Sequence, residues 1–261
     1  TKNANITTNE NGNYSFFFEA LGEFPLEEGK YTVKAEAEGN EYESYDWTFD
    51  IAYDILDEIN SHLEYDLDFY LAPKKVKNSD GQIVDSGVSG SWASYENKVV
   101  IDHDLIYPGY DLGIESAEKG ILNKPFEEIT VKDGVTISTR QVTIPTEGEP
   151  DYLNGVSTGN SGKILLQAER VNIGENVKIL ANAINDKGSN FSAGNITISS
   201  YAVGGTDFVD VLPGVDIDHP RAIIEIGKGT IIKGNEISFT ATANSDDIFH
   251  PDESDADTLI D

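Results

Sequence analysis

The sequence predicts a mainly β fold, most of which is a solenoid of stacked β-coils. The first observation is a pattern that occurs three times. In each copy, two apolar residues are separated by one other residue, and a three-residue break that contains glycine follows. A second pair of apolar residues with the same spacing comes after the break. In the last copy, Thr230 takes the place of one apolar residue. The copies lie at 129–137, 171–179 and 224–232. The second observation is a glycine before an alternating apolar stretch, at Gly162, Gly194 and Gly234. The two patterns alternate along the chain, with periods in the range of about 20–50 residues that is typical of solenoids.

Residues 1–52 are predicted to form short antiparallel strands. Apolar and polar residues alternate over Tyr31–Ala37 and Trp47–Ile51, and Tyr14, Phe16 and Phe18 alternate with Ser15 and Phe17. This period of two indicates strands with one packed face. The phrases Gly12–Phe16 and Gly29–Ala35 resemble the later strands of the immunoglobulin-like modules of large bacterial adhesins. The resemblance implies a partial Ig-like β-sandwich module.

This partial module predicts a partner. A sandwich of this kind needs about seven strands, and the sequence offers three or four. We expect another copy, or a neighbouring module of a larger parent protein, to add a strand to the amino-terminal β-edge. The alternative is that a following helix packs against this edge and the chain is a monomer.

Residues 53–127 are predicted to form a helix and a small mixed cap. Tyr53, Leu56, Ile59 and Leu63 have helical spacing, and Asp50 or Asp54 is a suitable helix cap. Strands are expected at 67–71, 83–84 and 99–101, a turn at 80–81 and an irregular loop over 107–120. Because an open β-edge invites aggregation, we interpret this region as a cap on the first coil.

Residues 128–261 are predicted to form the solenoid. The coils run over 162–193 and 194–233, with insertions at 146–160 and 203–220. Glycine at the corners allows the chain to turn without a Cβ clash. Alternate apolar residues face the coil interior, and we expect this of Ile173, Ile179, Ile196 and Ile226.

Three stretches, Gly134–Val142, Gly162–Ala168 and Asn244–Phe249, resemble the right-handed parallel β-helices of filamentous-haemagglutinin-like and other giant repetitive bacterial surface proteins. The resemblance implies a right-handed parallel β-helix, an extracellular or cell-surface location, and a structural or adhesive role as a scaffold or filament. The chain opens on Thr1, and we expect it to be a segment of a larger secreted protein.

The charge of the chain excludes some partners. There are 47 acidic and 18 basic residues among 261, a net charge of −29. Such a chain repels nucleic acid and anionic lipid, and no apolar run is long enough to insert into a membrane. Cysteine is absent, so there is no disulfide framework or thiolate metal site.

Acidic clusters are the candidate metal ligands. Two carboxylates at alternate positions of a strand share a face, and Ca²⁺ prefers six to eight oxygen ligands. The candidates are Asp102, Asp104, Asp207, Asp210, Asp216 and Asp218. The alternative is that these are solvated carboxylates in an acidic protein.

We expect the chain not to be an enzyme, and assign no catalytic residue. The four histidines lack paired spacing and there is no nucleophile elbow. The competing hypothesis is a carbohydrate-active β-helix enzyme, a polysaccharide lyase or glycosidase, which would use carboxylates and a basic residue. Its candidates lie on the second insertion: Asp207, Asp210, Asp216, Asp218 and Arg221.

A third hypothesis is carbohydrate binding by aromatic rings of the cap, although such rings more often form a core. These rings are Trp92, Tyr95, Tyr107 and Tyr110.

Overall fold

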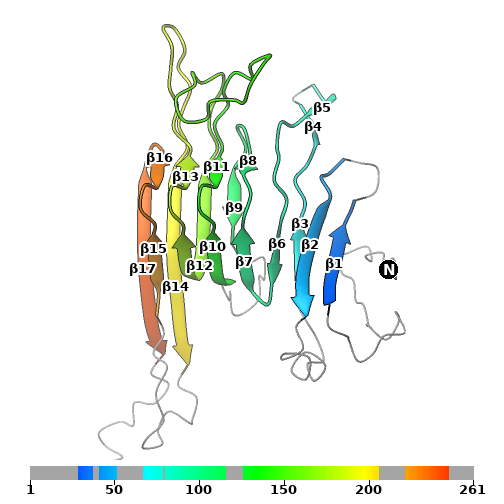
Figure 1. Cartoon of the computed structure of the whole chain (residues 1–261). Helices are drawn as coiled ribbons and strands as arrows, with labels where there is room; N and C mark the ends of the chain where they lie inside the picture. The colour runs from blue at the N-terminus through cyan, green and yellow to red at the C-terminus, as the bar shows by residue number, and fades with distance from the viewer. Residues whose placement is uncertain are drawn as a thin grey trace, which may run out of the picture.

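The structure, a computed structural model, describes residues 29–37, 41–51, 67–78, 80–115, 126–205 and 221–246. These residues form seventeen β-strands and no helix, so the described part of the chain is mainly β (Figure 1). The expected helix at 53–63 and the expected strand at 14–18 lie outside the described residues.

The amino-terminal strands form a hairpin. Strand β1 (Gly29–Ala35) pairs antiparallel with β2 (Tyr45–Ile51), and Val33 lies opposite Trp47. Both strands were predicted by the alternation of apolar and polar residues. The ring of Trp47 lies 4.8 Å from that of Tyr95, so the hairpin packs against the region that follows it.

The next strands begin the main sheet, apart from one separate ribbon. Strand β3 (Leu67–Tyr70) pairs antiparallel with β6 (Trp92–Tyr95), which pairs antiparallel with β7 (Lys98–Ile101). Between them β4 (Lys75–Lys77) and β5 (Ile83–Asp85) form a separate ribbon. Glu96 and Asn97 connect β6 to β7 with φ of 47° and 58°, the two left-handed residues that a tight hairpin turn requires.

From β7 onward, pairing between successive layers is parallel. One sheet is nine-stranded and a second sheet is four-stranded. The parallel strands of the first are β7, β9 (Leu112–Ile114), β10 (Phe126–Val131), β12 (Ile164–Ile173), β14 (Ile196–Gly205), β15 (Ile223–Ile226) and β17 (Ile237–Asp246). Those of the second are β8 (Leu105–Ile106), β11 (Thr136–Ser138), β13 (Lys178–Leu180) and β16 (Ile231–Lys233).

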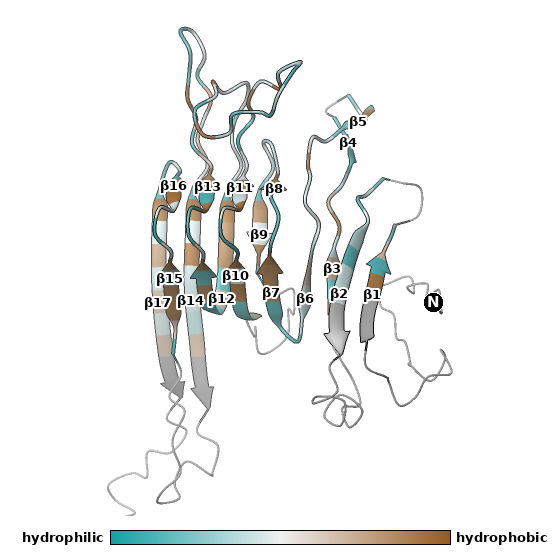
Figure 2. Ribbon diagram, in the orientation of Figure 1, coloured by the Kyte–Doolittle hydropathy of each residue, from teal (hydrophilic) through white to brown (hydrophobic). Residues whose placement is uncertain are grey.

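The register stacks like residues on one another. Val99, Ile129, Val171 and Ile224 form one row across β7, β10, β12 and β15. The buried members of such rows, from both sheets, join in one apolar core, and Figure 2 shows the apolar segments recurring on neighbouring strands. Dispersion and the removal of apolar area from water therefore stabilise each layer through its neighbours.

The glycine-containing breaks are the corners between the two sheets. Gly134, Asn176 and Gly229 occupy the same position in the three breaks, with φ of 75°, 56° and 77°. Only glycine adopts this left-handed conformation freely, and asparagine tolerates it better than most residues. Glycine therefore has the predicted role at two of the three breaks, and Asn176 takes that role at the middle one.

Two sequence-based expectations need correction. Ile173, Ile179 and Ile196 are buried, but Ile226 is 46% exposed, because no described strand pairs with the outer edge of β15. Strand β9 lies in the stretch predicted to be an irregular loop, where the single apolar pair flanking Gly113 gave little signal. Parallel pairing begins at Lys98, on β7.

Candidate interaction surface

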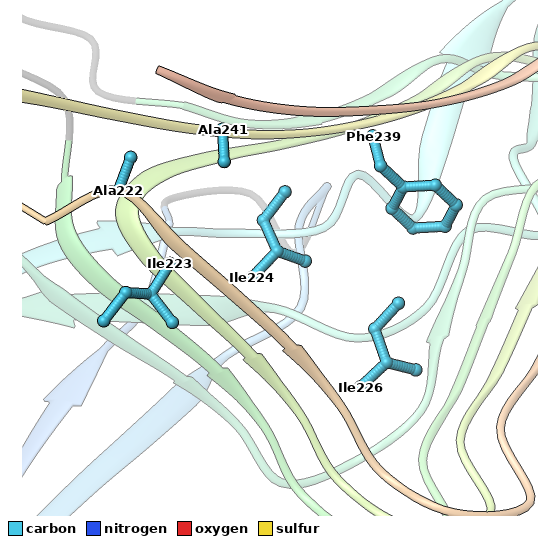
Figure 3. Close-up of a pocket in the computed structure, with 6 residues that line it drawn as sticks. All are labelled: Ala222, Ile223, Ile224, Ile226, Phe239 and Ala241. Carbon is cyan, nitrogen blue, oxygen red and sulfur yellow. The ribbon is translucent and has the colours of Figure 1, made fainter. Parts of the chain in front are cut away.

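The last layer of strands presents an open apolar surface. Among the described strands, β15, β16 and β17 each hydrogen-bond to one neighbouring strand, β12, β13 and β14 respectively. Ile226, Ile237 and Phe239 are 46%, 40% and 48% exposed. Figure 3 shows Ile224, Ile226 and Phe239 around one hollow between β15 and β17, with Ala222 and Ala241 beside them. We call the exposed or hollow-lining side chains of this region the end face. They are Ala222, Ile224, Ile226, Ile237, Phe239 and Ala241.

The end face repeats side chains that are buried one layer earlier. Phe239 is in register with Ile198, and Ile237 with Ile196; both partners are fully buried. The apolar row is thus continuous, and it becomes exposed only because no described residue covers the last layer. One further layer of strand would cover it.

The end face lacks the features that usually protect a sheet edge. Strand β17 is ten residues long and has no proline and no lysine. Its one charged residue is Asp246, at its end. Natural edges are usually short, charged, bulged or covered, so the composition of β17 favours an edge that pairs with another strand.

The last layer is also electrically neutral. Residues 221–246 contain three basic residues and three acidic ones, whereas the whole chain carries a net charge of −29. The six are Arg221, Lys228, Lys233, Glu225, Glu236 and Asp246. Two copies that meet over these residues therefore bring together no local excess of like charge.

The structure places two of the six predicted metal ligands. Asp102 Oδ1 lies 2.8 Å from His103 Nδ1, and Asp104 Oδ1 accepts a 2.7 Å hydrogen bond from the backbone N–H of Thr136. Asp207, Asp210, Asp216 and Asp218 lie outside the described residues. In the part of the chain that the structure describes, no three His, Asp or Glu side chains gather as metal ligands would. The calcium site stays a prediction.

Several aspartates have a structural role that sequence reasoning missed. Asp111 Oδ1 accepts a 2.7 Å hydrogen bond from the N–H of Lys163, and Asp133 Oδ1 accepts one of 2.7 Å from Glu175. Together with Asp104, each binds a backbone N–H of the next layer. In the sequence, each of these aspartates lies at or next to a corner. The position is one that meets a backbone N–H of the next layer.

The candidate carbohydrate-binding aromatics do not form an open platform. Trp92 is buried and stacks on Tyr70, with ring centroids 3.8 Å apart. Tyr107 donates a 3.2 Å hydrogen bond to the carbonyl of Gly90, and burial raises its pKa to about 12. Tyr95 lies against Trp47. Tyr110, 40% exposed, is the most accessible of the four.

A polar row crosses the outer side of the large sheet. Glu128 Oε1 accepts hydrogen bonds from Thr130 Oγ1 at 2.6 Å and from Asn172 Nδ2 at 2.8 Å. The hydrogen bond from Thr130, more than that from Asn172, lowers the pKa of Glu128. These hydrogen bonds tie β10 to β12, and Asn172 Oδ1 is buried with no hydrogen-bond partner among the described residues.

A buried arginine anchors the first insertion. Arg140 is fully buried and donates hydrogen bonds from its two terminal nitrogens to the carbonyls of Tyr152 and Gly155. Burial lowers the pKa of Arg140, while Asp151 acts in the opposite direction. The guanidinium thus holds the 146–160 segment on the stack.

Comparison of the chain with protein-family models, curated proteins and solved structures gave no significant match. Within the described residues, no helix has the length and apolar character of a membrane span.

Proposed function

We propose that this chain is a structural or adhesive segment of a large secreted bacterial surface protein. Its parallel strands form a right-handed parallel β-helix, which serves as an extended extracellular scaffold or filament. The observation that carries the proposal is the repeated in-register stacking from β7 to β17, which ends on apolar side chains that no described strand covers. A stack of this kind grows by adding layers and needs no central cavity.

The geometry of the described residues favours a scaffold over an enzyme. The end face is apolar, and the aspartates at 104, 111 and 133 are engaged with backbone N–H groups. A polysaccharide lyase or glycosidase would need free carboxylates beside a basic group. Arg221 is exposed, and the four aspartates proposed beside it are not described.

Two further parts of the proposal concern partners. The hairpin β1–β2 stands as a separate two-stranded sheet, and among the described residues β1 has β2 as its one strand partner. Another copy or a neighbouring module adds a strand at this amino-terminal β-edge. Calcium bound by the acidic clusters offsets part of the repulsion within a chain of net charge −29.

Antibodies raised against the chain test the location and the parent protein. Intact cells of the source organism should be labelled on their surface, and a blot should show a band much larger than this chain. Labelling that appears only after the cells are permeabilised would end the extracellular proposal.

A panel of acidic and neutral polysaccharides tests the enzyme alternative. With Ca²⁺ present, the chain should release no reducing ends and no unsaturated sugar above a heat-denatured control. Turnover that disappears in Arg221→Ala, but persists in the matched surface variant Lys228→Ala, would favour the enzyme.

A further inference from the structure

We propose that the end face binds the end face of a second copy of this chain, so that two stacks join end to end about a two-fold axis. The inference deepens the scaffold function proposed above, because it names the partner of its uncovered layer. It depends on the same stacking of strands.

The apolar pattern of the end face suits a copy of itself. Ile224, Ile226 and Phe239 surround one hollow, and Ile237 lies on the same strand as Phe239 (Figure 3). In a two-fold contact the same patch is used by both partners. Each exposed apolar row then meets an equally apolar row, which removes both from water.

The edge of β17 that no described strand pairs with supplies directional bonds for the same contact. A two-fold axis perpendicular to the stack runs β17 antiparallel to its copy, and antiparallel edges form regular N–H···O=C pairs. The strand offers ten residues for this pairing. The two large sheets would then continue into one another.

The local charge of the last strands does not oppose this contact. Two chains of net charge −29 repel strongly, but residues 221–246 are balanced at three basic and three acidic residues. The residues that follow, 247–261, carry six acidic residues, no lysine or arginine, and only two short apolar pairs. They are therefore less suited than a second copy to cover the continuous apolar row.

Sedimentation of the full chain at about 100 µM tests the proposal, a concentration at which a micromolar dimer is nearly complete. We expect twice the mass of one chain, with tighter association in high salt because salt screens the net charge. Phe239→Asp places a carboxylate on the end face and should raise the dimer dissociation constant at least about tenfold. The matched control is Ile144→Asp, which changes a side chain that is 74% exposed away from the end face and should leave the dimer intact.

Hydrogen exchange provides the second measurement. The amides of β17 should gain protection as the concentration rises, and those of β12 should be protected at every concentration. A monomeric chain with protected β17 amides would show that another part of the same chain covers the end, and would overturn the dimer while leaving the scaffold standing. A dimer that Phe239→Asp leaves unchanged would overturn the end-to-end contact and point to the β1 edge. Rapid exchange in β12 would overturn the stack and with it the scaffold function.

Discussion

Gly194 lies directly over Gly162 in successive layers of the stack. A Cβ atom added to Gly194 would stand 1.9 Å from the carbonyl oxygen of Gly162. One layer further, a Cβ on Gly234 would lie 3.1 Å from the carbonyl of Gly194. These glycines therefore allow the backbones to approach closely, a reason separate from the left-handed corners at Gly134 and Gly229.

Gly194→Ala should lower the free energy of unfolding by at least about 2 kcal/mol, because the added methyl group meets backbone that cannot move aside. Urea denaturation measures the change. The matched control is Gly113→Ala, whose Cβ would have Glu115 Oε1 as its nearest neighbour at 3.6 Å. That variant should be unchanged or more stable by up to about 1 kcal/mol. Equal losses in the two variants would contradict the close approach.

Ile179→Asp should destabilise the protein by several kcal/mol, because it buries an unpaired carboxylate. Ile179 is fully buried on β13, in register with Ile137 on β11. Its neighbour Lys178 points to the opposite side of the strand and is only partly buried. Lys178→Asp should therefore change the melting temperature little, and comparable shifts in the two variants would contradict the inward and outward alternation.

The sequence was sufficient to predict the parts of the fold that repeat. The Gly162, Gly194 and Gly234 patterns each precede a long parallel strand, and the three breaks became corners. These features depend on local rules, since apolar alternation sets the strand and a flexible residue sets the turn. A repeat shows such rules several times, which makes them easier to recognise.

The parts that sequence missed depend on contacts between layers. The hydrogen bond from the N–H of Thr136 to Asp104 joins residues 32 positions apart, and the burial of Trp92 depends on Tyr70 and Phe126. Strand β9 has too few residues to show a period. The end face is missed for another reason: Phe239 and Ile198 look alike in sequence and differ only in whether another strand covers them.

Alkaline pH should destabilise the protein through Tyr107. Burial, reinforced by Glu43, raises its pKa from 10.0 to about 12, so the folded state favours the neutral phenol. This contribution is present below pH 10 and is lost as the pH rises from 10 to 12, amounting to at most about 3 kcal/mol. In Tyr107→Phe the loss of stability over this pH range should be smaller by that amount. Other tyrosines with raised pKa values, such as Tyr70, leave a residual slope in both proteins. Identical slopes would show that Tyr107 titrates as freely as an exposed tyrosine.

Calcium should raise the melting temperature. Bound at a site in the native state, Ca²⁺ at a hundredfold excess over its dissociation constant adds roughly 2.7 kcal/mol to the free energy of unfolding. Melts in Ca²⁺ and in EDTA at matched ionic strength measure the effect, and Mg²⁺ at equal concentration separates binding from screening, because Mg²⁺ demands a smaller octahedral site. Asp102→Asn then tests one candidate ligand. Asp102 is exposed and its described partner is His103, so Asp102→Asn should leave the fold intact. If Asp102 is a ligand of the calcium site, this variant should also abolish the rise in melting temperature that Ca²⁺ causes. Unchanged calcium dependence in that variant would move the site to the aspartates between 207 and 218, and equal midpoints in all three solutions would leave no specific site.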